Sequence, residues 1–124
     1  MPHIEIQPPD PYAEGYLGRD LLAMQMQTQF RKLQREERML KAQARAGQEN
    51  EDLLISYGER AIAFSEQLIE FMAEYVVSVD GQAVSWSHPE DQGKIRWALK
   101  RATKPQIDQI LDVIRGVDME PPKS

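Results

Sequence analysis

The sequence predicts a mainly α-helical fold with a long antiparallel helical hairpin, a central two-stranded β-hairpin and two short C-terminal helices. Apolar residues recur at three- and four-residue spacings in two long segments before residue 75 and in two shorter segments after residue 87. Between them, the stretch YVVSVDGQAVSW (residues 75–86) surrounds an Asp-Gly pair, which is typical of a tight β-turn. The chain has 124 residues, 41% of them hydrophobic, and no cysteine. We therefore expect one domain that is held together by packing alone.

The two ends of the chain differ in composition from its middle. Residues 1–15 contain four prolines, which remove backbone donors and favour extended conformations. We expect a flexible arm there, since chain termini are disordered unless other contacts hold them. The alternative is an arm that docks on a neighbour through Ile4, Ile6, Tyr12 and Tyr16. Residues 16–117 are expected to form a single α-rich domain, and residues 118–124 a flexible tail.

The first long helix is expected over residues 18–46, with Gly47 as its stop. Its apolar stripe is narrow, which is typical of a helix that packs against one partner helix. The stripe consists of Leu22, Met26, Phe30, Leu33, Leu40 and Ala44.

The second long helix is expected over residues 51–74. Ile55, Ile62, Ile69 and Val76 follow one another at seven-residue intervals, beside a second row of apolar and small residues. The combined stripe is broad enough to face two neighbours. Small side chains such as Gly58 would allow another helix to approach closely.

Opposite charges distinguish the two long helices. Six bases and two acids lie in residues 31–45, whereas seven acids and one base lie in residues 49–74. The short link over residues 47–50 therefore predicts an antiparallel helical hairpin, in which the complementary charges set pairing and register. The net charge of −5 argues against a general nucleic-acid binder.

The β-hairpin is expected to turn at Asp80 and Gly81, because this pair favours a two-residue type I′ turn. That turn places Val79 opposite Gln82 and, further along, Tyr75 opposite Trp86. One face would then carry Tyr75, Val77, Val79, Val84 and Trp86, and the other Val76, Ser78, Ala83 and Ser85. A lone hairpin is marginally stable in water. Its apolar face must cover the chain's own helices, or its open edge must pair with another subunit.

Two capping signatures, at residues 87–90 and 103–106, predict helix starts. The first helix should span about residues 88–102 and the second about residues 104–115, where Gly116 ends it. The residues expected to face inward are Ile95, Ala98, Leu99, Ala102, Ile107, Ile110, Leu111 and Ile114.

Trp97 points away from the apolar face of its own helix and lies among four basic residues. It either packs on the hairpin or the helical pair, or anchors an acidic partner, since Trp and Arg are frequent at interface centres. Together with the apolar face of the hairpin, this surface is the predicted partner-binding site. Its residues are Tyr75, Val77, Val79, Trp86, Arg96, Trp97, Lys100 and Arg101.

Patterns typical of enzymes are missing from the sequence. His3 and His88 are the only histidines, and neither has a second ligand at metal-site spacing. The chain also lacks a glycine-rich phosphate loop, a nucleophile elbow, a long apolar membrane span and a signal peptide. We therefore expect a soluble, non-enzymatic intracellular protein without metal or cofactor.

The stretch FMAEYVVSVDGQAVSW, two short helices and the ending EPPKS follow one another in an order that resembles the tail assembly chaperones of long-tailed bacteriophages. The matching positions are Asp80, Gly81, Trp86, Pro122 and Lys123, within residues 71–124, although here the tryptophan follows the turn. The resemblance implies a chaperone in the host cytoplasm that binds the tape-measure protein and assists tail polymerisation. It also implies a second, longer form made by frameshifting.

Two other functions fit the same residues. One is a structural virion, neck or head-tail connector protein that forms an oligomeric ring through its arm and hairpin. The other is a small regulator that binds nucleic acid through Lys94, Arg96, Trp97, Lys100 and Arg101. A homo-oligomer is expected in either of the two assembly roles.

Overall fold

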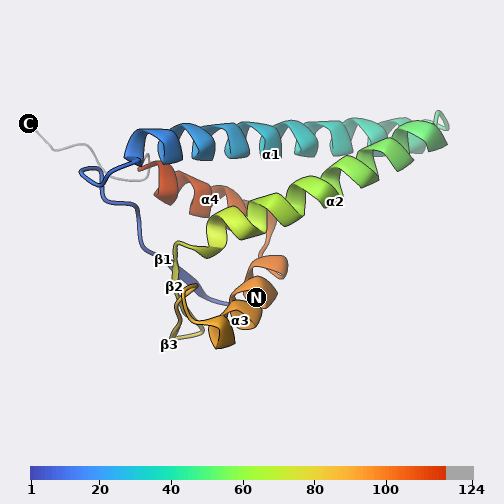
Figure 1. Cartoon of the computed structure of the whole chain (residues 1–124). Coiled ribbons are helices and arrows are strands. Elements are labelled where there is room, and N and C mark those ends of the chain that lie inside the picture. Colours follow the sequence, from blue (N-terminus) through green and yellow to red (C-terminus); the bar gives the residue numbers. More distant parts are fainter. Residues whose placement is uncertain (117–124) are drawn as a thin grey trace, which may run out of the picture.

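The computed structural model describes residues 1–116 and has four helices and three short strands (Figure 1). This arrangement confirms the predicted mainly helical fold. The predicted flexible tail, residues 118–124, lies outside the described residues. Along the chain the elements are β1 (Ile4–Ile6), α1 (Tyr16–Arg45), α2 (Glu51–Ala73), β2 (Val76–Val79), β3 (Gln82–Ala83), α3 (Pro89–Lys100) and α4 (Lys104–Arg115).

Helices α1 and α2 form the predicted antiparallel hairpin. Gly47 takes a φ of 75° after α1, and the side chain of Asn50 accepts a hydrogen bond of 3.2 Å from the backbone N–H of Leu53 at the start of α2. These two caps close the connection within a few residues. The helices lie close together at this connection and separate towards their other ends, where α4 lies along α1 (Figure 1).

The core lies at the wide end of the hairpin, where α1, α2, α3, α4 and the sheet meet. Its largest fully buried apolar side chains are Met72, Val79, Ile95, Leu111 and Ile114. The closed end of the hairpin extends beyond this core, α3 and the sheet (Figure 1). This extension leaves parts of α1 and α2 with no covering layer.

The first residues of the N-terminal arm form a strand, which differs from the flexible arm that the sequence predicts. Strand β1 pairs antiparallel with β2, with Ile4 opposite Val79, and gives a sheet in the order β1-β2-β3. Asp80 and His3 are joined twice, because each backbone N–H donates to an oxygen of the other residue at 2.8 Å. This pairing satisfies the backbone N–H and C=O groups along one edge of β2. It also lets Ile4 and Ile6 pack against the core.

The β-turn is confirmed, but the predicted division of the hairpin into two faces is wrong in part. Asp80 and Gly81 take positive φ values of 51° and 81°, and Val79 lies opposite Gln82. Both Val76 and Val79 are buried, whereas Val77 is 37% exposed. A register shift in the pairing with β1 interrupts the simple alternation at this point.

The two C-terminal helices begin and end close to the predicted residues, but only one capping signature holds. The Thr103 hydroxyl accepts a hydrogen bond of 3.3 Å from the backbone N–H of Gln106 at the start of α4. The other helix begins after His88, whose side chain makes no capping bond, and the Ser87 hydroxyl bonds that of Ser85 instead. All eight residues predicted to face inward are buried or partly buried.

Charge pairing between α1 and α2 differs from the prediction. Within residues 1–116, no ion pair joins a base of α1 to an acid of α2. The one pair between these helices is reversed, because Arg60 of α2 donates to Glu36 of α1 at 3.0 Å. The bases of α1 instead pair with α4, pair within α1 or lie exposed. No helix in this part of the chain has the length and apolar composition of a membrane span.

Candidate functional site

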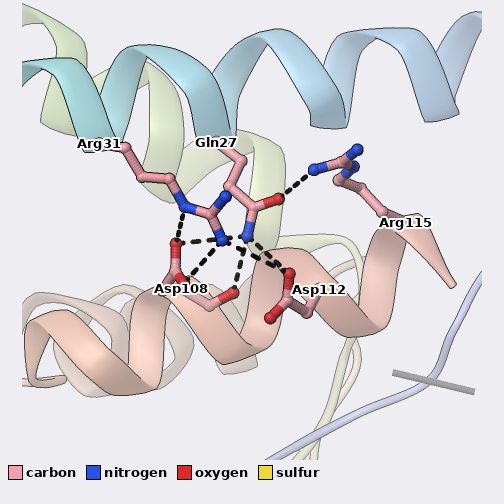
Figure 2. Close-up of polar contacts among 5 residues, drawn as sticks. All are labelled: Gln27, Arg31, Asp108, Asp112 and Arg115. Atoms are coloured by element: carbon pink, nitrogen blue, oxygen red, sulfur yellow. Dashed lines mark hydrogen bonds and ion pairs between the residues drawn. The ribbon is translucent and has the colours of Figure 1, made fainter. Parts of the chain in front are cut away.

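The first gathering of polar side chains lies between α1 and α4 (Figure 2). We call it the polar cluster; it consists of Gln27, Arg31, Asp108, Asp112 and Arg115. The side-chain amide of Gln27, which is 0% exposed, donates to Asp112 Oδ1 at 2.8 Å and to the backbone oxygen of Asp108 at 3.2 Å. Arg31 donates two hydrogen bonds of 3.0 Å to the carboxylate of Asp108. On the other side, Arg115 donates to Gln27 Oε1 at 2.5 Å.

The polar cluster fixes the position of α4 and offers no chemistry of its own. The guanidinium of Arg31 lowers the pKa of Asp108, so this carboxyl remains ionised rather than acting as an acid. Both carboxylates have protein donors, and the cluster contains no nucleophile or histidine. No group of three or more potential metal ligands occurs within residues 1–116. We therefore assign the polar cluster a structural role.

Sequence reasoning missed the polar cluster, although a signal was present. Gln27 and Arg31 are four residues apart on one helix, as are Asp108 and Asp112 on another. Each pair lies on one side of its helix, so two such pairs can face each other. Nothing in the sequence indicates that these two helices are neighbours.

A second ion-pair network involves Glu37 of α1. Its carboxylate accepts from Lys41 at 2.8 Å and from Lys104 at the start of α4. These two ammonium groups lower the pKa of Glu37 from 4.5 to about 2. Glu37 interrupts the apolar stripe of α1 because it binds α4 at this point.

This network predicts an acid-dependent loss of stability. A carboxyl whose pKa is lowered in the folded state stabilises the fold above pH 4.5, and this contribution disappears as the pH falls towards about 2. Glu37→Gln should therefore reduce the slope of unfolding free energy against pH in this range, as measured by urea unfolding. Glu49→Gln, at an exposed position without an ion pair in the described structure, is the control. An equal slope in wild type and Glu37→Gln would contradict the assignment.

The predicted partner-binding residues on the hairpin are separated by the fold. Tyr75 and Val79 are buried in the core, so they are not available to a partner in this structure, which corrects their assignment. Val77 is exposed at the sheet, and Trp86 is partly buried. The guanidinium of Arg96 lies 4.7 Å from the ring centre of Trp86 and donates to Glu70 of α2 at 2.8 Å. Trp86 and Arg96 thus connect α3 to its neighbours.

Trp97, Lys100 and Arg101 remain together on an exposed face of α3 and the residue that follows it. Trp97 is 47% exposed, and the guanidinium of Arg101 lies 5.3 Å from its ring centre. The basic, aromatic character of this face agrees with the sequence. Its role in binding a partner stays a prediction.

An apolar stripe runs along one side of α2. Ile55 and Ile62 are 59% and 64% exposed, whereas Ile69 packs against the core and Ala73 is fully buried. Residues seven apart lie on the same side of a helix. One continuous stripe is therefore covered in the C-terminal half of α2 and uncovered in its N-terminal half.

We define the uncovered face of α2 as Ile55, Glu59, Ile62 and Glu66, with the partly buried Ile69 at its end. Its spacings of four and three residues keep apolar and acidic side chains on one side of the helix. Where this face meets α3, it ends in a hollow of about 370 Å³ lined by Glu66, Ile69, Glu70, Arg96 and Lys100. The sequence signal for this face was the seven-residue interval of the isoleucines.

Comparison with protein-family models, with curated proteins and with solved structures found no match for the chain. The uncovered face of α2 is therefore interpreted from its geometry and chemistry alone.

Proposed function

We propose that this chain is a non-enzymatic tail assembly chaperone of a long-tailed bacteriophage, acting in the host cytoplasm. In this proposal, an amphipathic helix of the tape-measure protein binds along the uncovered face of α2. The observation that supports it is the half-covered stripe: the C-terminal half of α2 packs against the core, while Ile55 and Ile62 remain exposed. A client helix bound there would lie next to α3 and cover the exposed half of the stripe.

The chemistry of the face indicates the client's character. Isoleucines at seven-residue intervals fit the apolar seam of a second helix. Full burial of one such side chain contributes about 1.5–3 kcal/mol. Glu59 and Glu66 beside the seam favour a client helix with basic flanking residues and oppose one with acidic flanks.

Small residues next to the seam support the same interpretation. Gly58 and Ser65 lie three residues after Ile55 and Ile62, and a Cβ added at Gly58 would meet no atom within 4 Å. A client helix could therefore approach α2 closely between the isoleucines.

The test of this function is mass spectrometry on phage-infected cells and on purified phage particles. We expect the cells to contain this chain and a minor longer product that shares its sequence and continues in another reading frame. Neither form should occur in finished particles. Abundant protein in particles without any longer product would contradict the chaperone function and make the chain a structural virion component.

A further inference from the structure

The outer side of α1 carries a second uncovered stripe, which we call the outer face of α1. It consists of Leu17, Leu21, Met24, Thr28, Lys32, Arg35 and Met39. Successive members are three or four residues apart, so they lie on one side of the helix, and all of them are exposed. Like the uncovered face of α2, it combines apolar with charged side chains.

The two uncovered faces have opposite charge. Lys32 and Arg35 lie on the outer face of α1, and Glu59 and Glu66 lie on the uncovered face of α2. None of these four side chains takes part in an ion pair within residues 1–116. Each face therefore presents charges that a partner of opposite charge can satisfy.

The two faces also match in length. On α1, Met24 and Met39 enclose the two bases and are 15 residues apart, whereas on α2, Ile55 and the partly buried Ile69 enclose the two acids and are 14 residues apart. At 1.5 Å per residue, both segments span roughly 21–23 Å. One segment can lie along the other with apolar ends in contact and opposite charges between them.

A contact between these faces cannot form within one chain. The buried residues Ala23 and Gln27 mark the side of α1 that faces α4, and the outer face of α1 lies on another side of the helix. The uncovered face of α2 instead lies on the side where α2 and α3 form their hollow. Figure 1 shows α1 along one edge of the molecule, with α3 and α4 on the same side of it. The two faces therefore point to opposite sides of the helical hairpin.

From this arrangement we propose that the outer face of α1 in one copy binds the uncovered face of α2 in a second copy. Because the two faces differ and point in opposite directions, the contact is head-to-tail. Such a contact forms a ring if it closes and a filament if it does not. Each copy covers the apolar stripe of the next.

The contact has a consequence for the proposed function. The second copy and the client helix would occupy the same face of α2, so self-association and client binding would exclude each other. This consequence rests on the proposed function, whereas the self-contact does not require any client.

Reversal of the charges tests the contact by sedimentation velocity of the purified chain over a concentration series. Wild type should form oligomers that dissociate as salt is raised, because exposed charges are screened. Lys32→Glu/Arg35→Glu makes both faces acidic, and Glu59→Lys/Glu66→Lys makes both faces basic. Each variant alone should associate at least about tenfold more weakly than wild type.

Mixing gives the decisive outcome. An equimolar mixture of the acidic and the basic variant should restore oligomers, since the acidic faces of one meet the basic faces of the other. Arg19→Glu/Arg45→Glu, on α1 but outside the outer face, is the control for net charge and should associate like wild type. Circular dichroism verifies that each variant is folded.

Three results would overturn the contact: a wild type that stays monomeric at all concentrations, charge-reversed variants that associate like wild type, or a mixture that does not associate. None of these depends on the client. Failure of self-association is thus distinguishable from failure of the proposed function.

Discussion

Replacement of Gln27 by leucine is expected to lower the free energy of unfolding by about 2–4 kcal/mol, because it removes the buried centre of the polar cluster. The amide of Gln27 donates to Asp112 at 2.8 Å and accepts from Arg115 at 2.5 Å. Leucine has a similar volume but can do neither. It would leave the carboxylate of Asp112 and the guanidinium of Arg115 without this partner at the contact between α1 and α4.

Chemical denaturation measured by circular dichroism tests this expectation. Gln25→Leu is the matched control, since Gln25 is exposed on the same helix and its replacement should change stability by less than about 0.5 kcal/mol. Equal stability of Gln27→Leu and Gln25→Leu would show that the polar cluster does not hold α4 in place.

If the proposed function holds, replacement of Ile62 by lysine is expected to weaken binding of a tape-measure helix by about 30-fold or more, because a central anchor of about 2 kcal/mol is lost. Lysine would place a charged ammonium group where the apolar seam of the client helix has to pack. Because Ile62 is 64% exposed in the free chain, the fold itself should be affected little. Fluorescence anisotropy with a labelled tape-measure segment measures affinity, and thermal unfolding measures stability.

Ala63→Lys is the control for this substitution. Ala63 is also exposed and precedes Phe64 on α2, but it lies about 100° further round the helix from Ile62. It should bind the segment like wild type. Equal affinities for wild type and Ile62→Lys would remove the uncovered face of α2 from the proposed function.

The sequence predicts the four helices well, because their ends have local causes. Gly47 and Gly116 take left-handed φ values after α1 and α4, as glycine readily does. Thr103 caps α4 with its hydroxyl. The β-turn is predictable for the same reason, since Asp80 and Gly81 alone determine its type.

The faces of the β-hairpin could not be predicted, because a distant segment determines them. Strand β1 pairs with β2 with a register shift between Glu5 and Ile6, more than 60 residues away along the chain. Which side chains of β2 are buried, here Val76 and Val79, depends on that pairing and on the helices that pack against the sheet. The prolines of the arm indicated disorder, but Ile4 and Ile6, which lie between Pro2 and Pro8, pack against the core.

Charge composition also misled the prediction, since it does not say which side of a helix each charge occupies. Arg31 of α1 faces α4 and binds Asp108, while Lys32 and Arg35 face outward. The same limit applies to the predicted partner-binding residues. Trp97, Lys100 and Arg101 share an exposed surface, but Tyr75 and Val79 are buried in the core. A seven-residue apolar interval located the uncovered face of α2, and only the fold revealed which half of it is covered.

Site-specific photo-cross-linking from position 62 during phage infection tests the central claim most directly. A photoreactive residue at position 62 should join this chain to the tape-measure protein, identified by mass spectrometry, whereas the same residue at position 63 should do so far less. Equal cross-linking from both positions, or none from position 62 while tape-measure protein is present, would contradict a helix-binding role for the uncovered face of α2.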